Sequence, residues 1–496
     1  MVAVDLGAQS GRVAVARLED GRLSLCEVHR FANAPVRAGG TLYWDILALY
    51  GGVIQGLRRA AGETDGRVES VGVDTWGVDF ALLDRAGRLL GNPVHHRDGR
   101  SARGMAYALS RFPARALYER TGIQLMPINT LFQLAAMAEA GDPTLDAART
   151  FLLVPDLLHY WLCGEVGCER TNATTTACLD LRQGAWARDL LAALGIPAAI
   201  FPQLVPPGAR LGPLREDVAE ETRLDRAEVV APATHDTASA VAAVPFRQQG
   251  SAYVSAGTWS LVGVERLQPA IDERTFAANL TNEGGVGGTV RLLRNVTGLW
   301  LLHECRRTWA EEGREWGYEE LLALAEEAAP LRSLVDPDHP SFVPPGDMPA
   351  RIRSFCAATG QPVPETPGEV VRCALESVIL GQRRALELLR AAAGADPAEV
   401  HVVGGGARNR LLCQWTADAA GLPVLAGPEE ATLVGNACVQ AMGLGELTSL
   451  AEAREVVRLS FPPLVYEPGA QDPWDDAYGR LQEMSSSPEA AEAGKA

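Results

Sequence analysis

Lysine is almost absent from this sequence. Of its 45 lysine and arginine residues, Lys495 is the only lysine. A P-loop needs Gly-Lys-Ser/Thr and a protein-kinase fold needs a lysine on a strand, so both of these nucleotide-binding schemes are excluded. Schiff-base chemistry on lysine is excluded for the same reason. Any phosphate group must therefore be bound by backbone N–H groups, hydroxyls, arginine or a metal ion.

Paired metal-binding cysteines are also absent. The nine cysteines are scattered, none forms a CxxC motif, and Cys163 and Cys168 lack a second pair at zinc-site spacing. We therefore predict buried free thiols rather than a zinc centre. The sequence leaves open whether Cys356 and Cys373 form a disulfide.

The sequence has no secretory or membrane signature. Residues 1–5 lead into a predicted strand without a basic segment, and no uninterrupted apolar run is long enough to span a bilayer. The formal net charge of −17 argues against nucleic acid and acidic membranes as partners. A chain of 496 residues is too long for one core. We therefore expect a cytoplasmic protein of two domains.

A polar segment in the middle of the chain is the candidate centre of the site. Thr234-His235-Asp236-Thr237 follows an apolar run, and small residues continue from it as a predicted helix. A carboxylate at a helix start lies beside exposed amides, so it can accept a proton while the amides face an anion. We expect Asp236 to take this role.

Two segments far apart in the sequence share one design. Residues 2–18 and 252–264 each predict two strands joined by a turn rich in glycine and hydroxyl residues. In the first turn, Gly7 and Gly11 permit the positive φ angles and the close backbone approach of an anion nest. An ordinary glycine turn is the alternative. Two such hairpins with one acid between them suggest two lobes that close on a phosphate.

Further candidate ligands accompany these turns. In the first hairpin, Ser10 adds a hydroxyl, Arg12 adds a cation, and Asp5 at a strand end is a candidate Mg²⁺ ligand through water. Strand 400–403 runs into Gly404–Gly406 and a helix, a geometry that suits nucleotide approach. That glycine run also fits a simple tight turn.

The lobe boundary is placed in the Pro/Gly-containing segment 244–250. This gives an N-terminal lobe of residues 1–244 and a C-terminal lobe of residues 245–483. From Met484 on, Ser, Glu, Ala and Gly predict a disordered tail over residues 484–496.

Three polar segments lie near predicted strand ends. Residues 74–79 follow a buried strand, where open α/β sheets bind ligands. Adjacent residues on a strand point to opposite faces, so we interpret His95 and His96 as a solvated or sugar-contacting loop rather than a metal site. The hydroxyl-rich residues 171–176 are either a sugar-facing edge or a plain turn.

These segments, in this order, resemble the FGGY carbohydrate kinases, and among them the rhamnulokinase group. The matching stretches extend from residue 2 to about residue 440: VDLGAQSGR, GVDTWGVDF, TGIQLMPINTLFQL, TNATTT, HDTASA, SAGTWSL, TNEGG, NVTGLWLL and HVVGGGARN. The resemblance implies an α/β, actin-like (ribonuclease H-like) fold of two lobes, each a mixed sheet flanked by helices, with the active site in the cleft. It also implies transfer of the ATP γ-phosphoryl group to C1 of L-rhamnulose with Mg²⁺.

The resemblance also implies roles for individual residues. Asp236 corresponds to the catalytic base, and the implied sugar contacts are Gly77, His235, Asp236, Thr237 and Asn295. The implied ATP contacts are Ala8, Gln9, Ser10, Gly11, Arg12, Thr258, His303, Gly404, Gly405 and Gly406. The partners are then a small sugar and ATP, with the protein a monomer or a homodimer.

Two positions depart from the family pattern, and three alternatives stay open. Gln9 replaces the usual serine of the first loop, and His303 stands where the family usually has glutamine. The nearest alternative is a kinase of the same family for fuculose, xylulose or glycerol. The others are a non-catalytic sugar-responsive binding protein and an actin- or chaperone-like ATPase.

Overall fold

The computed structural model describes residues 1–247 and 250–485. The chain forms two compact units, and each is built from more than one stretch of sequence. The first unit comprises Met1–Pro245, Glu265–Leu292 and Glu430–Pro462, and the second comprises Phe246–Val264, Leu293–Glu429 and the chain from residue 463 on.

This division differs from the predicted lobes, which divide the chain at a single point. Residues 265–292 and 430–462 also belong to the first unit. In the second of these stretches, Leu433 packs against Ala3 and Ala14 of the first sheet. Met484 and Ser485, the first residues of the predicted tail, are helical. Residues 486–496, the remainder of that tail, lie outside the described residues.

The first unit is built on a six-stranded mixed sheet. Its strands occur in the order β13 (Arg210–Pro213), β14 (Glu228–Val230), β6 (Ser70–Thr75), β1 (Val2–Leu6), β2 (Ser10–Glu19) and β3 (Arg22–Ala32). Strands β1, β6 and β14 are parallel, whereas β1–β2, β2–β3 and β13–β14 are antiparallel pairs.

A second sheet repeats this arrangement with one strand more. Its seven strands occur in the order β17 (Thr281–Gly284), β18 (Val290–Thr297), β16 (Trp259–Arg266), β15 (Ala252–Ala256), β19 (Val400–Val403), β20 (Val424–Ala426) and β21 (Leu464–Tyr466). By contacts, β17 and the first residues of β18 belong to the first unit. Again a hairpin, β15–β16, is followed by two parallel partners and an antiparallel edge strand. The predicted repetition of the hairpin therefore extends to the strands beside it, and a mixed sheet in each lobe is confirmed.

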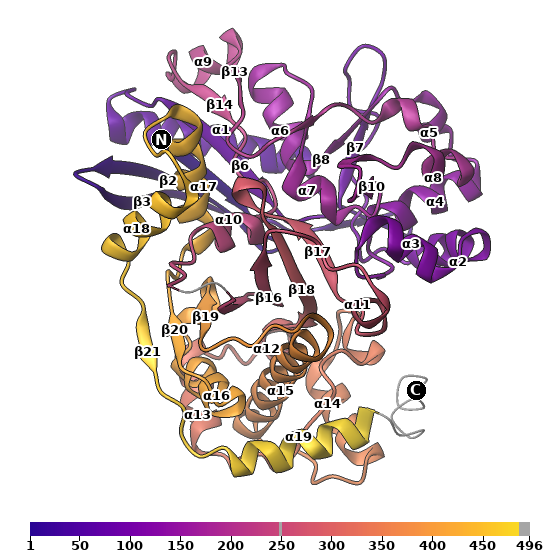
Figure 1. The fold of residues 1–496 in the computed structure, drawn as a ribbon, viewed down its shortest axis with the longest axis vertical. Coiled ribbons are helices and arrows are strands. Elements are labelled where there is room, and N and C mark those ends of the chain that lie inside the picture. Colours follow the sequence, from indigo (N-terminus) through magenta and orange to yellow (C-terminus); the bar gives the residue numbers. More distant parts are fainter. Residues whose placement is uncertain (248–249, 486–496) are drawn as a thin grey trace. The chain divides into compact units, whose positions relative to one another are not determined.

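Helices flank both sheets (Figure 1). Those of the first unit are α1 (Ile46–Thr64), α2 (Arg100–Arg111), α3 (Ala114–Thr121), α4 (Thr130–Ala140), α5 (Pro143–Ala147), α6 (Val154–Cys163), α7 (Arg170–Thr175), α8 (Arg188–Ala193), α9 (Glu216–Thr222), α10 (Asp236–Ala242), α11 (Glu273–Ala277), α17 (Ala431–Leu444) and α18 (Leu450–Ser460). Those of the second are α12 (Trp300–Glu311), α13 (Tyr318–Glu327), α14 (Met348–Ala358), α15 (Pro367–Ala393), α16 (Arg410–Ala420) and α19 (Asp472–Ser485).

Short strands complete the first unit. These are β4 (Val36–Ala38), β5 (Thr41–Tyr43), β7 (Phe80–Leu83), β8 (Thr150–Leu153), β9 (Cys168–Glu169), β10 (Leu179–Asp180), β11 (Ala185–Trp186) and β12 (Leu204–Val205).

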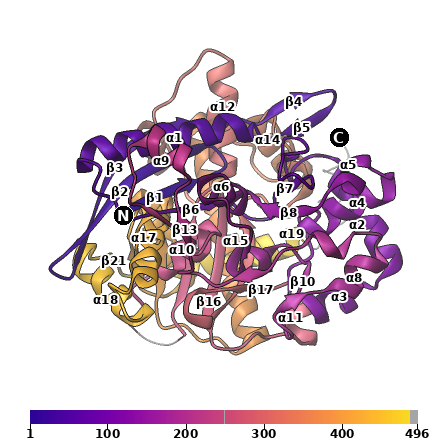
Figure 2. The same cartoon turned by 90° about the horizontal axis from the view of Figure 1, so that it is seen from above.

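The alternation of residues along β1 and β2 explains how helices cover the two faces of the first sheet. Successive strand residues face opposite sides, and on one side the sheet meets α1, which lies along β2 and β3 (Figure 2). There Val13 packs closely against Gly56 of α1. On the other side Ala3 and Ala14 are small, and they contact Leu433 of α17. Small residues therefore allow α17 to approach the strands closely.

Local sequence signals mark several helix ends. Thr366 accepts a hydrogen bond from Glu369 N, and the Glu369 side chain accepts from Thr366 N, so a capping box begins α15. Gly394 adopts the left-handed conformation at its end (φ 62°). Gly164 ends α6 in the same way.

The cysteines are free thiols, and seven of the nine are buried. Cys356 on α14 and Cys373 on α15 are neighbours. Contact with the Cys356 thiol, together with burial, raises the pKa of Cys373. Within residues 1–247 and 250–485, none of the helices combines the length and apolar composition needed to cross a membrane.

Candidate functional site

Asp236 is the first residue of α10, as predicted. The residues before it extend the first sheet, because Thr75 N donates to Thr234 O at 2.9 Å and Thr75 pairs with His235 in a parallel bridge. The side chain of Asp236 is 29% exposed. A partly exposed carboxylate is thus held at the carboxyl end of β6.

Four predicted site residues meet at this point. Thr237 donates its backbone N–H and its hydroxyl to Asp236 Oδ1, the latter at 3.0 Å. His235 Nε2 lies 3.5 Å from the same oxygen. A Cβ atom on Gly77 would lie 3.4 Å from His235 Nε2 and 3.0 Å from Thr175 Oγ1, so the backbone packs tightly there. The structure therefore brings together Gly77, His235, Asp236 and Thr237.

An acidic cluster borders Asp236. Asp5 on β1 and Asp74 on β6 are register partners, and Arg12 lies opposite Asp5 on β2. Arg12 forms ion pairs with Asp5 and Glu430. Burial raises the pKa of Asp5, Arg12 opposes that effect, and Asp236 and Glu430 add to it. Burial and the charge of Asp5 likewise raise the pKa of Asp74 well above its usual range.

Asp74 is positioned by α17. Asn436 Nδ2 donates to Asp74 Oδ2, and it also lies 3.2 Å from Gly72 O. Among the described residues, Asp74 Oδ1 is buried with no hydrogen-bond donor. Carboxylate oxygens are the ligands that Mg²⁺ prefers. Asp5, the predicted metal ligand, and Asp74, which the sequence analysis missed, therefore fit a divalent cation.

The first turn differs from a glycine-based anion nest. Neither Gly7 nor Gly11 has a positive φ angle, so this part of the prediction is wrong. Gly11 is required by packing instead, because a Cβ atom there would lie 2.3 Å from the Phe31 ring and 2.7 Å from Leu6.

Asn33 holds the first turn and was not anticipated. Its N–H donates to Gln9 O at 3.0 Å, and its Nδ2 donates to Gly7 O at 2.8 Å. Gln9 is exposed at the tip, whereas Ala8 and Ser10 are half-buried. The turn is therefore anchored through the carbonyl groups of Gly7 and Gln9, and Gly7 N donates to Ser10 O at 3.0 Å across it.

The predicted nucleotide residues of the second unit form a second group. Gly404 has φ 80°, which favours glycine. A Cβ atom on Gly406 would lie 2.3 Å from Ala256 Cβ, while one on Gly405 would meet nothing within 4 Å. The backbone at Gly405 is thus open to an approaching ligand. Residues Gly405–Arg408 form a short 3₁₀ helix before α16.

Thr258 joins the second hairpin to α12. Its carbonyl accepts hydrogen bonds from Gly298 N and Trp300 N, both at 3.2 Å. His303 lies one turn further along this helix, where burial and Arg306 lower its pKa to about 4. Asn295, a predicted sugar contact, is on β18 in the second unit.

A buried carboxylate organises the segment that carries Gly77. Asp79 Oδ2 accepts hydrogen bonds from Trp44 Nε1 (2.6 Å), Trp76 Nε1 (2.9 Å) and His96 Nδ1 (2.8 Å). Gln133 Nε2 donates to Oδ1 at 3.3 Å. Burial alone would raise the pKa of Asp79, but His96 and these donors lower it. Asp79 is therefore charged at neutral pH.

The interpretation of His95 and His96 as solvated is wrong. Both are buried, and their rings lie 4.4 Å apart beside Asp79. His95 follows an isolated bridge at Val94, and His96 begins a turn, so these adjacent side chains need not point to opposite faces as on a strand. Burial and His96 lower the pKa of His95 to about 3. Because Asp79 Oδ2 already accepts three hydrogen bonds, this cluster is a hydrogen-bonded support.

Val78 has a strained backbone between Gly77 and Asp79. Its φ angle is 69°, rare for a β-branched residue, and Asp79 N donates to Gly77 O at 3.0 Å across it. The carbonyl of Val78 accepts from Thr130 Oγ1 (2.6 Å) and Gln133 Nε2 (3.3 Å). Such strain persists only where surrounding contacts hold it, and it concentrates at functional sites.

We expect Asp79→Asn to destabilise the protein by about 1.5–3 kcal/mol at neutral pH, because hydrogen bonds to a charged group are lost or weakened. Since the pKa of Asp79 is lowered in the folded protein, the difference from wild type should shrink as pH falls below about 4. Urea unfolding at several pH values measures it. Asp84→Asn, in a surface turn, is the matched control and should unfold like wild type. Equal stability of Asp79→Asn and wild type at pH 7 would contradict this role.

Residues 171–176 are not a plain turn. Most of them form the buried helix α7, whose first turn is capped by Glu169. Glu169 is fully buried and accepts from Thr171 N (2.7 Å), Thr234 N (2.9 Å) and Thr234 Oγ1 (3.0 Å). It therefore joins α7 to the segment that ends in Asp236.

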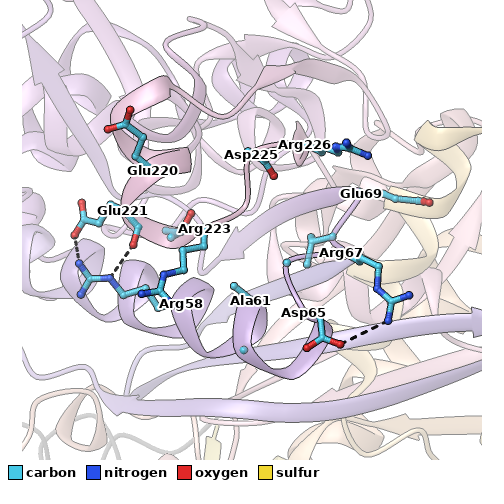
Figure 3. A pocket seen from close by; sticks show the side chains of 14 residues that line it. Arg58, Ala61, Asp65, Arg67, Glu69, Glu220, Glu221, Arg223, Asp225 and Arg226 are labelled. Carbon is cyan, nitrogen blue, oxygen red and sulfur yellow. Dashed lines mark hydrogen bonds and ion pairs between the residues drawn. The ribbon is translucent and has the colours of Figure 1, made fainter.

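A wide groove elsewhere in the first unit carries no predicted site residue. It has a volume of about 1400 Å³ and lies between the end of α1 and α9. Figure 3 shows that its arginine and acidic side chains alternate, and Arg58 pairs with Glu221 at 2.7 Å. These mixed, mutually paired charges favour no particular ligand.

Several positioning residues were missed because they are remote in sequence. Asn33, Glu169, Glu430 and Asn436 act through contacts with segments tens to hundreds of residues away. Glu283 lies within the Thr-Asn-Glu-Gly-Gly stretch, where its polar and glycine neighbours gave no local signal that its side chain is buried.

Comparison with known proteins places both units in one family. Residues 1–243 match the N-terminal domain, and residues 252–444 the C-terminal domain, of the FGGY family of carbohydrate kinases. A rhamnulokinase of Bacteroides thetaiotaomicron is 45% identical over 476 residues, which cover 96% of this chain and 97% of the relative. A rhamnulokinase of Pectobacterium carotovorum is 40% identical and covers 100% of this chain and 98% of the relative.

Solved structures share the fold at low identity. A gluconate kinase from Lactobacillus acidophilus superimposes with a TM-score of 0.81 at 18% identity, covering 100% of this chain and 99% of that chain. A Plasmodium falciparum glycerol kinase with ADP gives a TM-score of 0.76 at 13% identity, with 97% and 98% coverage.

Proposed function

The chain belongs to the FGGY family of carbohydrate kinases, and we propose that it transfers the γ-phosphoryl group of ATP to the C1 hydroxyl of L-rhamnulose. The observation that carries this proposal is identity of 40–45% to rhamnulokinases over nearly the full length of both chains. The products are L-rhamnulose 1-phosphate and ADP.

Asp236 is the proposed catalytic base. A primary alcohol is a poor nucleophile at neutral pH, and a positioned carboxylate that accepts its proton contributes roughly 10²–10⁴-fold. The C1 oxygen forms the new bond to γ-phosphorus as the bond to the ADP oxygen breaks, and the hydroxyl proton moves to Asp236. The partly exposed carboxylate and its two contacts with Thr237 support this role.

The proposed sugar contacts surround Asp236 in the first unit, with Asn295 added from the second. His235 and Thr237 supply polar atoms at the carboxylate itself. The tight packing of Gly77 against His235 supports close approach of the backbone to a sugar hydroxyl.

The proposed ATP contacts are Ala8, Gln9, Ser10, Gly11, Arg12, Thr258, His303, Gly404 and Gly405. The open backbone at Gly405 and the low pKa of His303, which keeps that imidazole neutral at pH 7, support this set. Because Arg12 is paired with Asp5 and Glu430, we propose that it screens these carboxylates from the phosphates.

Asp5 and Asp74 would hold Mg²⁺, directly or through water. When bound, Mg²⁺ neutralises charge on the transferring phosphates. Arg12 and Asn436 fix the two carboxylates, so their orientation does not depend on the ion.

A coupled assay of ADP release tests the substrate. L-Rhamnulose should give the highest kcat/KM in a panel with fuculose, xylulose and glycerol, and ADP release without sugar should be low. A higher kcat/KM for another sugar would change the proposed substrate but not the proposed phosphoryl transfer. Sugar-independent ATP turnover, or no turnover with any sugar, would contradict the proposed reaction.

A further inference from the structure

His235 contacts a buried ion pair on the side of its ring away from Asp236. The pair is Glu283 on β17 and Arg291 on β18, with side chains 5% and 0% exposed. Arg291 Nη2 lies 3.1 Å from Glu283 Oε2 and 3.1 Å from His235 Nδ1. Glu283 Oε2 lies 3.3 Å from His235 Nδ1. All three side chains belong to the first unit.

The hydrogens in this triangle can be assigned from chemistry. A guanidinium group only donates, and Nη2 carries two hydrogens. One satisfies Glu283 Oε2 and the other satisfies His235 Nδ1, which must then present a lone pair. A proton on Nδ1 could donate to Glu283 Oε2 at 3.3 Å, but it would face the N–H of Arg291 at the shorter distance of 3.1 Å, so the contact with Arg291 opposes an Nδ1–H tautomer or an imidazolium. The remaining form is the neutral ring with its proton on Nε2.

The other side of the ring is consistent with this form. His235 Nε2 is 3.5 Å from Asp236 Oδ1, and it faces Gly77. An N–H beside a carboxylate is attractive, whereas a lone pair there would be repulsive. Nε2–H thus offers a donor at the point where Asp236 offers an acceptor.

Second contacts immobilise the ion pair. Arg291 Nε donates to Gly284 O at 2.9 Å. The N–H of Gly284 in turn donates to Thr174 Oγ1 at 2.8 Å, which fixes the position of this glycine.

We propose that Glu283 and Arg291 are positioning residues that fix His235 as the Nε2–H tautomer, so that it donates a hydrogen bond to a sugar hydroxyl while Asp236 accepts the proton of the reacting one. This inference rests on the proposed function for the identity of the sugar. The tautomer itself is a property of the sugar-free protein.

Arg291→Met tests the inference by removing the donor and leaving Glu283 beside His235. Long-range ¹H–¹⁵N spectra of the sugar-free protein should show wild-type His235 with Nδ1 unprotonated and Nε2 protonated, with His235→Asn assigning the resonances. In Arg291→Met, Nδ1 should become protonated and pair with Glu283. We expect kcat/KM for the ketose to fall by about 10²-fold, mainly through KM, with KM for ATP unchanged.

Two controls separate positioning from general stability. Glu283→Gln keeps the Arg291 donor and should keep the wild-type tautomer. Arg372→Met breaks another buried ion pair, to Glu376 at 2.7 Å in the second unit, and should leave the His235 resonances unchanged.

Each outcome has one meaning. Wild-type His235 protonated on Nδ1, or an unchanged tautomer in Arg291→Met, overturns the inference. If Arg291→Met does not fold, the spectra of the wild type and Glu283→Gln still test the inference, because both proteins should carry the His235 proton on Nε2. The stated tautomer in a wild-type protein that does not phosphorylate the ketose overturns the proposed function instead.

Discussion

Replacing Asp236 with asparagine should lower kcat by roughly 10²–10⁴-fold while leaving ATP affinity near that of wild type. The amide has nearly the size of the carboxylate and keeps an oxygen for the Thr237 hydrogen bonds. It cannot accept the proton of a sugar hydroxyl. Steady-state kinetics with L-rhamnulose measures turnover, and calorimetry with ATP measures binding.

A matched control is available in the same unit. Asp217 lies in the first turn of α9, as Asp236 does in α10, but it is exposed and remote from the predicted site residues. Asp217→Asn should turn over like wild type. Near-wild-type turnover in Asp236→Asn would remove Asp236 from the catalytic role, whatever the affinity for ATP.

Glu169→Ala should destabilise the protein by about 1–3 kcal/mol for each buried donor that is left without an acceptor. The change leaves the donors of Thr171 and Thr234 without an acceptor inside the first unit. Because Thr234 immediately precedes His235 and Asp236, we also expect kcat to fall by about 10²-fold in the folded fraction. Urea unfolding and initial rates below the unfolding transition measure the two effects.

Glu169→Gln is the conservative comparison. Its carbonyl oxygen still accepts from some of these donors, whereas its NH₂ group faces the others, so both losses should be smaller than in Glu169→Ala. Glu376→Ala in the second unit removes another buried carboxylate, one that accepts from Arg372 and Leu331 N. It should reduce stability while kcat of the folded fraction stays unchanged. A stable Glu169→Ala protein with wild-type kcat would show that Glu169 positions nothing.

The supports of Asp236 differ in kind. Glu169 fixes the chain before it, Asp79 and Val78 fix the strained segment that carries Gly77, and Glu283 contacts His235. Each is buried, and none was assigned a role from the sequence. Rigid placement of this kind allows a single carboxylate to act on a bound alcohol without reorganisation.

What the sequence determined by itself was local. The Thr366 capping box, Gly164 and Gly394 set helix ends, because each end depends on residues within one turn. The hairpin at residues 2–18 and the start of α10 at Asp236 followed from the same kind of signal. The scarcity of lysine also excluded the P-loop without any structure.

The tertiary structure decided which distant groups meet. Glu430 pairs with Arg12, and Asn436 contacts Asp74, because the chain returns to the first unit after residue 430. Burial then changes the chemistry of these groups, since a charge removed from water must find a partner or shift its pKa. The interpretation of His95 and His96 as solvated was wrong for the same reason. Strand alternation is a local rule, whereas their burial beside Asp79 results from packing between segments that no local pattern specifies.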